Sequence, residues 1–381
     1  MTRIEVSRVT CIADVRLTPA LEAEADLMGL LRTYSTRGKQ VALKSRAALL
    51  PGKRFGLVEA PSDLIRMYVP RQHERAVMAR LAATADLFMP GRGSVFAEDA
   101  VIVGDPLEFW DQSRLCLDAP AWADDQRMQP APYDLIFCIV PRGHGDDLAR
   151  VMLDMGLCVP TVSYGEGVGL RDRLGLLRIT IPVEKEILWF LVPPGDSDFV
   201  VDVATRKAGL TQPGHGFLGR SPVRALAVNS RLLVDRRRHV ASMEQVISTL
   251  DQLRGSTDWR RMSGIHPRRS AGMHRHARAM TRLTLVCEEG TSGGPVRAAL
   301  DAGAGGATLV RLNRRAPAPI DHADDEAAMV SHARECCDLI VRQSLAGRIE
   351  EAVTASGLYE DPVHGFIEVG QVHDAVTYRP G

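Results

Sequence analysis

The sequence lacks net charge, paired cysteine motifs and long apolar runs, and each absence excludes a class of protein. Lys and Arg total 47, as do Asp and Glu, so no global charge draws the chain to nucleic acid or an anionic membrane. The seven cysteines are odd in number and form no CxxC, which favours buried thiols in a reducing compartment over disulfides or zinc. No stretch approaches the ~18 apolar residues of a membrane span, and the N-terminus lacks a signal-peptide core. We therefore expect a cytoplasmic protein.

Three strand-like runs each begin a similar stretch of the chain. They are RVTCIADV (8–15), YDLIFCIV (133–140) and RLTLVCEE (282–289), and each precedes a helical pattern, a glycine and a second strand. A third strand, a second helix, a glycine-containing turn and a last strand follow. The order β-α-β-β-α-β is typical of a ferredoxin-like module, with both helices on one face of an antiparallel sheet. The prediction is an α+β fold of three tandem ferredoxin-like modules; three unrelated α+β domains are the alternative.

The composition places the boundaries of these modules. We predict modules at 1–104, 132–230 and 281–381, a proline-containing linker at 105–131, and a basic linker with one helix at 231–280. The stretch 229–282 holds twelve arginines and four acids, but Trp259 is its only aromatic residue. It lacks the interleaved aromatics of a nucleic-acid-binding surface, so we predict no nucleic-acid binding.

The helix before each last strand ends in a turn that contains glycine. Glycine permits positive φ, and consecutive N–H groups in such a turn form a concave nest that suits phosphate, to which Arg92, His215 or His364 adds charge. The alternative is a turn that only caps the helix. Because Val363 replaces a glycine in the third copy, we expect the third site to be the weakest. The candidate binding residues of the turns are Gly91, Arg92, Gly93, Ser94, Gly214, His215, Gly216, His364 and Gly365.

The spacing between an acid of the third strand and the turn supports the internal repeat. It is 29 residues from Asp63 to Arg92 and 29 from Glu186 to His215. From Asp338, in the third strand predicted at 337–345, to His364 it is 26, which predicts that the third repeat has lost about one helical turn.

The middle repeat resembles the PII signal-transduction family, or nitrogen-regulatory proteins. The resemblance lies in YDLIFCIVPRGHGDDLARVMLDMG, TVSYGEG, VEKEILWFLVP and AGLTQPGHGF, and it extends to the other repeats only through the internal alignment. PII proteins are trimers that hold adenine nucleotides in three clefts between neighbours and dock on partner proteins through a protruding loop. The resemblance implies a pseudo-trimer in one chain, a monomer that binds ATP, ADP or AMP in one or two clefts.

The resemblance also implies residues around the nucleotide. One group matches the glycine-rich base of the protruding loop, and the other opens the third strand beside the cleft; a flexible hinge and a solvated strand edge are the alternatives. The loops lack the modified tyrosine tip and the loop-base glutamine of nitrogen-sensing members, so sensing of 2-oxoglutarate is not implied. The candidate binding residues are Gly165, Glu166 and Gly167 at the loop base, and Glu184, Lys185 and Glu186 at the start of the third strand.

The resemblance, together with the internal repeat, implies a regulatory protein. It would bind an adenine nucleotide between modules and control a partner, such as a membrane transporter or an enzyme, through its loops. No nucleophile motif surrounds Ser221 or the Cys336–Cys337 pair, and the histidines of the basic linker lack companions at ligand spacing, so we predict neither catalysis nor a metal site. An enzyme or metal-handling protein on the same fold, and a ligand-free structural adaptor, are the alternatives. A valine at Gly91 or Gly216 is expected to weaken nucleotide binding and leave the fold intact.

Overall fold

The computed structural model describes eight stretches of the chain, and its helices and strands lie close to where the sequence predicts them. The described residues are 2–44, 56–104, 109–115, 129–154, 158–169, 183–229, 280–317 and 329–377. The predicted basic linker with its helix therefore lies outside the described residues, as does most of the linker at 105–131.

Twelve of the strands fall into three groups of four, which we call the first, second and third repeats. The first contains β1 (Arg3–Asp14), β2 (Thr33–Lys44), β3 (Gly56–Val69) and β4 (Gly93–Val103). The second contains β5 (Ala131–Pro141), β6 (Thr161–Val168), β7 (Glu184–Val192) and β8 (Phe217–Ala227). The third contains β9 (Met280–Glu288), β10 (Ala307–Pro317), β11 (Met329–Arg342) and β12 (Phe366–Val372), and β13 (Asp374–Thr377) follows it.

A pair of helices accompanies each repeat. The pairs are α1 (Thr18–Leu27) with α2 (Glu74–Thr84), α3 (Gly145–Asp154) with α5 (Pro194–Ala208), and α8 (Gly293–Asp301) with α9 (Gln343–Ala355). Short 3-10 turns, Val15–Leu17 and Arg71–His73, lead into the two helices of the first repeat. Local signals set several ends: α5 begins with a proline and ends at Gly209, which takes the left-handed conformation at φ 63°.

The strands form one continuous antiparallel sheet, so the prediction of an α+β fold of three tandem ferredoxin-like modules is wrong. The order of the thirteen strands is β10-β11-β9-β12-β4-β1-β3-β2-β6-β7-β5-β8-β13, with further pairings β10–β2, β10–β6 and β4–β8. Each repeat keeps one internal order, in which the first and third strands lie between the last and the second. The edge strands pair with edge strands of other repeats, which satisfies backbone groups that separate sheets would leave open. The predicted module boundaries stay a prediction.

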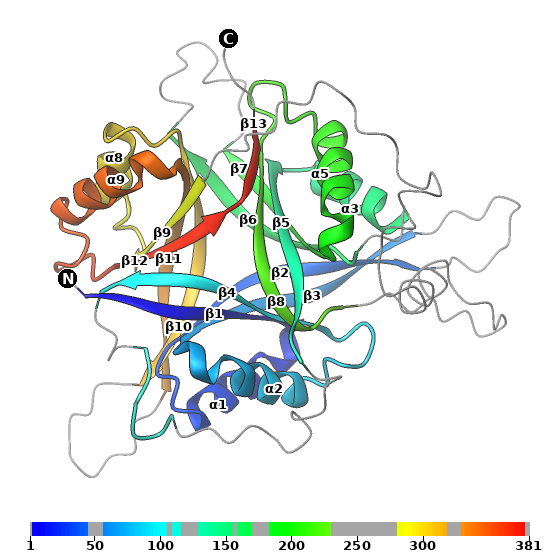
Figure 1. Cartoon of the computed structure of the whole chain (residues 1–381), viewed down its shortest axis with the longest axis horizontal. Helices are drawn as coiled ribbons and strands as arrows, with labels where there is room; N and C mark the ends of the chain where they lie inside the picture. Colours follow the sequence, from blue (N-terminus) through cyan, green and yellow to red (C-terminus); the bar gives the residue numbers. More distant parts are fainter. Residues whose placement is uncertain are drawn as a thin grey trace, which may run out of the picture.

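Figure 1 shows the consequence of this pairing. The three helix pairs lie at three corners, and the strands of all three repeats meet between them. The second strands meet one another through β2–β6, β6–β10 and β10–β2, whereas the last strands meet through β4–β12 and β4–β8. Each repeat therefore touches both of the others.

The register of the third strands corrects the alignment made on the sequence. Asp63, Glu186 and Glu335 occupy equivalent positions opposite the first strands. Glu335, not Asp338, is therefore the counterpart, and it precedes His364 by 29 residues, as in the other repeats. The third repeat has lost no helical turn. Its third strand ends at 342, before the predicted end, because α9 begins there.

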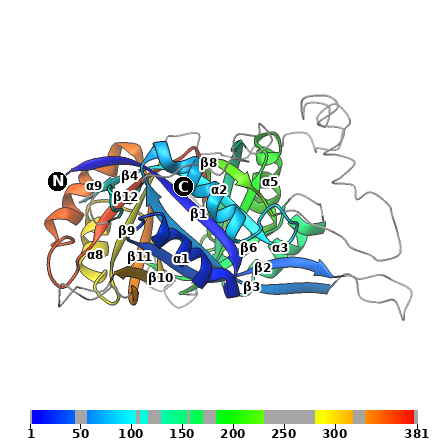
Figure 2. The ribbon, with the colours of Figure 1, turned by 90° about the horizontal axis from the view of Figure 1, so that it is seen from below.

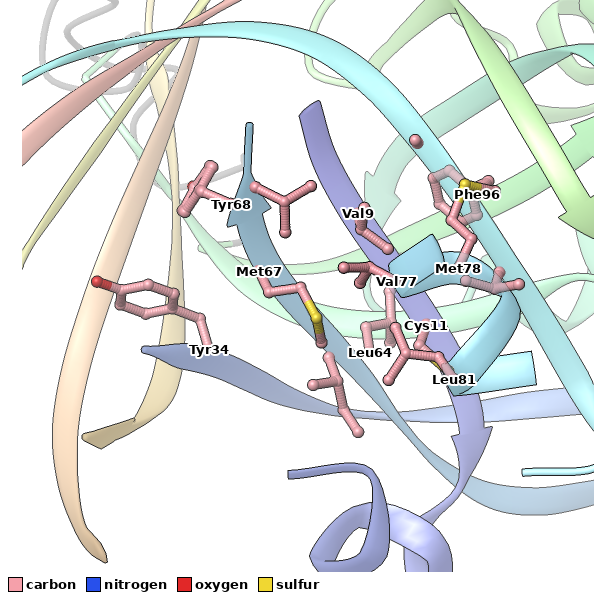
Figure 3. Packing of buried hydrophobic residues seen from close by; sticks show 14 of the residues in the cluster. Val9, Cys11, Tyr34, Leu64, Met67, Tyr68, Val77, Met78, Leu81 and Phe96 are labelled. Atoms are coloured by element: carbon pink, nitrogen blue, oxygen red, sulfur yellow. The ribbon is translucent and has the colours of Figure 1, made fainter. Parts of the chain in front are cut away.

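Buried apolar residues form one central cluster and two smaller clusters. One of the smaller clusters includes residues of α3 and α5 in the second repeat, and the other includes residues of α8 and α9 in the third. The central cluster draws on all three repeats, and its first-repeat part includes Met67, Val77 and Phe96 (Figure 3). Edge-on aromatic contacts link Tyr68 and Phe366 at 5.6 Å between ring centroids. The core thus joins the repeats as well as filling each of them.

A buried ion network also joins the first and third repeats. Arg8 of β1 pairs with Glu98 of β4 and Glu368 of β12, and Arg282 of β9 lies 2.9 Å from Glu98. Tyr68 donates a hydrogen bond to Glu368 at 2.6 Å. Burial favours a neutral Glu98, but the charges of Arg282 and Arg8 outweigh it and lower its pKa to about 2.

Removing one charge of this network is expected to destabilise the protein. Glu98→Gln leaves two buried guanidiniums with one carboxylate, so we expect a loss of about 3 kcal/mol in the free energy of unfolding at pH 7. A carboxylate with a lowered pKa stabilises the fold above its ordinary pKa of 4.5, and this contribution disappears as pH falls toward about 2. Urea unfolding should therefore show that the difference in unfolding free energy between the two proteins shrinks as pH falls from 4.5 to about 2.

The control is Glu59→Gln, which removes an ion pair to Lys39 from a carboxylate that is 49% exposed. Exposed pairs contribute little, so we expect a change below about 1 kcal/mol. Equal effects of the two substitutions would contradict a stabilising role for the buried network.

Candidate functional site

The predicted turns share a backbone conformation in the first two repeats. Gly91 and Gly93 have φ of 81° and 143°, and Gly214 and Gly216 have φ of 79° and 129°. In the third turn His364 is left-handed, with φ 41°. Such a conformation favours glycine, so the pattern found in the sequence does mark a repeated backbone device.

The second glycine of each turn packs against the end of the first strand. A Cβ atom would lie 1.9 Å from the Ile12 carbonyl oxygen at Gly93 and 1.9 Å from that of Ile139 at Gly216. At Gly365 it would lie 2.7 Å from the carbonyl oxygen of Val286. These glycines therefore permit a close approach of two strands, which is a structural role. A Cβ at Gly91, in contrast, would meet nothing within 4 Å.

The expectation that a valine at Gly216 leaves the fold intact is therefore wrong. Even Gly216→Ala places a carbon inside the contact distance of a backbone oxygen, and we expect it to cost more than about 4 kcal/mol of unfolding free energy. Gly91→Ala meets open space and carries only the strain of a positive φ, about 1 kcal/mol. Thermal and urea unfolding of both variants measure the difference; similar losses would contradict these separate roles.

Each turn lies at a junction with another repeat. The N–H of Gly91 donates to Asn229 Oδ1, just after β8, at 3.0 Å, and Thr377 of β13 donates to the carbonyl of Gly216 at 3.2 Å. Beside the third turn, Tyr359 donates to the carbonyl of Val103 at 3.2 Å. We call these places the first–second, second–third and third–first junctions.

The first–second junction is filled by the chain itself. The side-chain oxygen of Asn229 accepts a hydrogen bond from the N–H of Gly91. The backbone N–H of Asn229 donates to Ser94 Oγ at 2.8 Å, and its side-chain amide donates to Gln40 Oε1. The cavity beside it, lined by Ser94, Asn229 and Trp189, measures about 10 Å³. A space of this size holds one water molecule at most, so a nucleotide does not fit this junction with the side chains as they lie.

The central side chains of the turns make contacts within their own repeats. Arg92 is exposed and lies 4.0 Å from Asp86. His215 packs over Gly209, where a Cβ would lie 3.0 Å from its Nδ1. His364 Nε2 lies 3.3 Å from Asp361. None of these contacts crosses a junction.

The predicted loop-base glycines belong to strand β6 and lie against β10. A Cβ at Gly165 would lie 2.7 Å from the carbonyl oxygen of Leu309, and Gly167 pairs with Thr308. Glu166 lies 3.9 Å from Arg311. The glycines thus allow the second and third repeats to approach closely, at the second–third junction.

The three residues that open β7 have different surroundings. Glu186 is buried and accepts hydrogen bonds from the N–H groups of Gly143 and Gly145 at 3.1 and 2.7 Å, so it caps the start of α3. Glu184 forms an exposed pair with Arg142 at 2.8 Å. Lys185 is half-buried, and burial lowers its pKa. Of the three, Lys185 is the residue suited to a ligand at the second–third junction.

The third–first junction holds a group of basic residues that the sequence did not reveal as a site. Arg314 of β10 pairs in register with Tyr34 of β2, and Arg334 of β11 donates to the carbonyl of His364 in the third turn at 3.0 Å. Arg32 precedes β2 and lies beside Tyr34. The local signal in the sequence is the run NRR at 313–315.

A larger cavity lies where the last strands of the three repeats meet. It measures about 220 Å³ and is lined in part by Glu98, Ser221, Arg224 and Gln371. Arg224 is already bound by Glu74, with both distances 2.7 Å. This arginine is thus paired within the protein.

Among the residues that the structure describes, no helix is both long and apolar enough to cross a membrane. Nor do three or more His, Cys, Asp or Glu side chains come together within these stretches in a way that could hold a metal ion.

Comparisons of the chain with models of protein families, with curated proteins and with solved structures find no match.

Proposed function

We propose that the chain is a PII-like regulatory protein that binds an adenine nucleotide at junctions between its repeats. The observation that carries the proposal is the placement of the turns. Three turns, far apart in the sequence, each lie beside the terminal segment of a different repeat. A left-handed turn at a junction offers backbone N–H groups to phosphate, and a ligand bound there would couple two repeats.

The junctions differ in their suitability for a nucleotide. The first–second junction is closed by Asn229, as described above. The second–third junction offers the turn of His215 with the half-buried Lys185, and the third–first junction offers several guanidiniums. We therefore assign nucleotide binding to one or both of these two junctions, which gives fewer than three nucleotides per chain.

The hairpin of β2 and β3 is the best candidate for contact with a partner protein. Its strands pair from Tyr34–Arg66 out to Lys44–Gly56, and in Figure 2 they extend past α1 and α2 and lie beside α3. A partner docked there, a transporter or an enzyme, would respond to the nucleotide because β2 also pairs with the second and third repeats. We place this activity in the cytoplasm, where the buried free thiols, such as Cys11 and Cys138, stay reduced.

Nucleotide binding is tested by thermal stabilisation and calorimetric titration with ATP, ADP, AMP and cyclic AMP. A ligand that binds only the folded chain at 100 times its Kd should add about 2.7 kcal/mol to the unfolding free energy. We expect one or two bound nucleotides per chain. Gly91→Ala serves as the control, because it alters the closed first–second junction and should leave affinity unchanged. The absence of stabilisation by all four ligands would contradict the proposal and favour a ligand-free adaptor.

The protein should be a monomer of 41.6 kDa in solution. The edges that separate modules would use to associate are paired inside one chain, through β2–β6, β6–β10 and β10–β2. Tethering fixes the local concentration of the repeats, so dilution should not separate them. Sedimentation equilibrium measures the mass; a mass of three chains would contradict this prediction.

A further inference from the structure

The cavity where the last strands meet is lined by residues of all three repeats, which distinguishes it from the junctions. Glu98 and Asp99 come from β4, Ser221 and Arg224 from β8, and Gln371 from β12. Its volume of about 220 Å³ is smaller than that of the sites that hold drug-sized ligands. The space therefore suits a small metabolite.

The pairing of the strands explains why a space opens at this place. β4 pairs with β8 at residues 95–97 and with β12 at residues 100–103. Glu98 and Asp99 lie between these two stretches, where β4 passes from one partner to the other. The cavity thus follows from the way in which the three last strands exchange partners.

Glu98 is not available as a site for a cation. Arg8 and Arg282 both pair with it, and their charges lower its pKa to about 2. A further cation would compete with two guanidiniums for the same carboxylate. The ligand must therefore find its charged partners elsewhere in the cavity.

Arg224 and Asp99 provide those partners, because each has hydrogen-bonding atoms that no described residue uses. Nε and Nη2 of Arg224 donate to Glu74, and Nη2 also donates to Asp99 Oδ1 at 2.6 Å. Among the described residues, Nη1 of Arg224 donates to none and Oδ2 of Asp99 accepts from none. Their side chains are 39% and 45% exposed, so a ligand can reach them from solvent.

The other lining residues add neutral polar groups and an apolar wall. Ser221 Oγ donates to the backbone carbonyl of Gln371 at 2.8 Å, which leaves the hydroxyl oxygen able to accept. The side-chain amide of Gln371 bonds no described residue and offers both a donor and an acceptor. The remaining lining residues are Pro132, Pro222 and Val223.

A free α-amino acid is complementary to this combination of groups. One carbon atom joins its carboxylate to its ammonium group, and Arg224 and Asp99 present the opposite charges side by side. Its net charge is zero, so it would not disturb the balance of the ion pairs around the cavity. A small aliphatic side chain would pack against the two prolines and the valine.

We propose that this cavity binds one small aliphatic α-amino acid per chain, with its carboxylate on Arg224, its ammonium group on Asp99 and the amide of Gln371 beside them. The site does not depend on the proposed nucleotide function. Because the lining residues come from the last strands of all three repeats, an occupant stabilises the place where the repeats meet.

The test is calorimetric titration of the full chain with L-alanine, ethylamine and propionate, in phosphate buffer. Ethylamine lacks the carboxylate of L-alanine, and propionate lacks its ammonium group. We expect one L-alanine per chain, bound at least about tenfold more tightly than either fragment, because each charge forms its own charge-assisted hydrogen bond. Ethylamine or propionate that binds as tightly as L-alanine would overturn the assignment. Failure of both L-alanine and L-valine to bind would overturn the proposal.

Two matched substitutions locate the site. Asp99→Asn removes the partner of the ammonium group and should weaken L-alanine binding at least about tenfold. The control is Asp146→Asn, which neutralises a carboxylate that is 48% exposed and lies 2.9 Å from Lys39, outside the cavity. We expect the control to change affinity less than twofold. Equal affinity of Asp99→Asn and the unmodified chain would overturn the proposal.

A second measurement separates a ligand site from a structural role. Without ligand, Asp99→Asn loses only exposed ion pairs, so its melting temperature should fall by less than about 4 °C. A larger fall would assign Asp99 to the fold and overturn its role in binding. Gln371→Ala removes no hydrogen bond between the side chains of described residues and should weaken binding at least threefold; unchanged affinity would overturn the placement in this cavity.

ATP distinguishes this site from the nucleotide-binding junctions. We expect L-alanine to bind with the same affinity in the presence and absence of ATP, since the cavity lies apart from the three turns. L-alanine binding without any ATP binding would support the cavity site and contradict the nucleotide function. ATP that displaces L-alanine would overturn the assignment to a separate cavity.

Discussion

The need to pair every strand edge governs this structure. A four-stranded unit leaves two rows of backbone donors and acceptors open, and here the second and last strands of each repeat find partners in the other repeats. That pairing gives one sheet of thirteen strands and brings the terminal segment of each repeat onto the turn of another. The junctions, and with them the candidate sites, are products of the pairing of edges and not of any single repeat.

Periodicity and glycine spacing sufficed to locate the strands and the turns, because both depend on local sequence. The pairing between repeats could not be predicted from the sequence, because backbone hydrogen bonds between edge strands require no particular side chain. The same limit explains the misplaced acid of the third repeat: Glu335 and Asp338 are equally plausible in the sequence, and only the register of β11 on β9 selects Glu335.

The backbone turns of the candidate site could be predicted from the sequence, but the charged side chains beside them could not. The glycine turns were visible in the sequence, but the structural role of Gly216 depends on the carbonyl of Ile139, which is distant in the chain. Arg32 lies in another repeat from Arg314 and Arg334, and only the pairing of β2 with β10 brings the three together. Arginines at such separations resemble scattered surface charge until the fold is known.

Three repeats in one chain permit an asymmetry that a trimer of identical subunits forbids, because symmetry would copy every substitution to all three junctions. Here equivalent positions hold Gln40, Gly167 and Arg314 at the three junctions. The first–second junction is closed by Asn229, and the second–third junction is closely packed around Gly165. Covalent linkage thus lets the residues of each junction diverge independently of the other two.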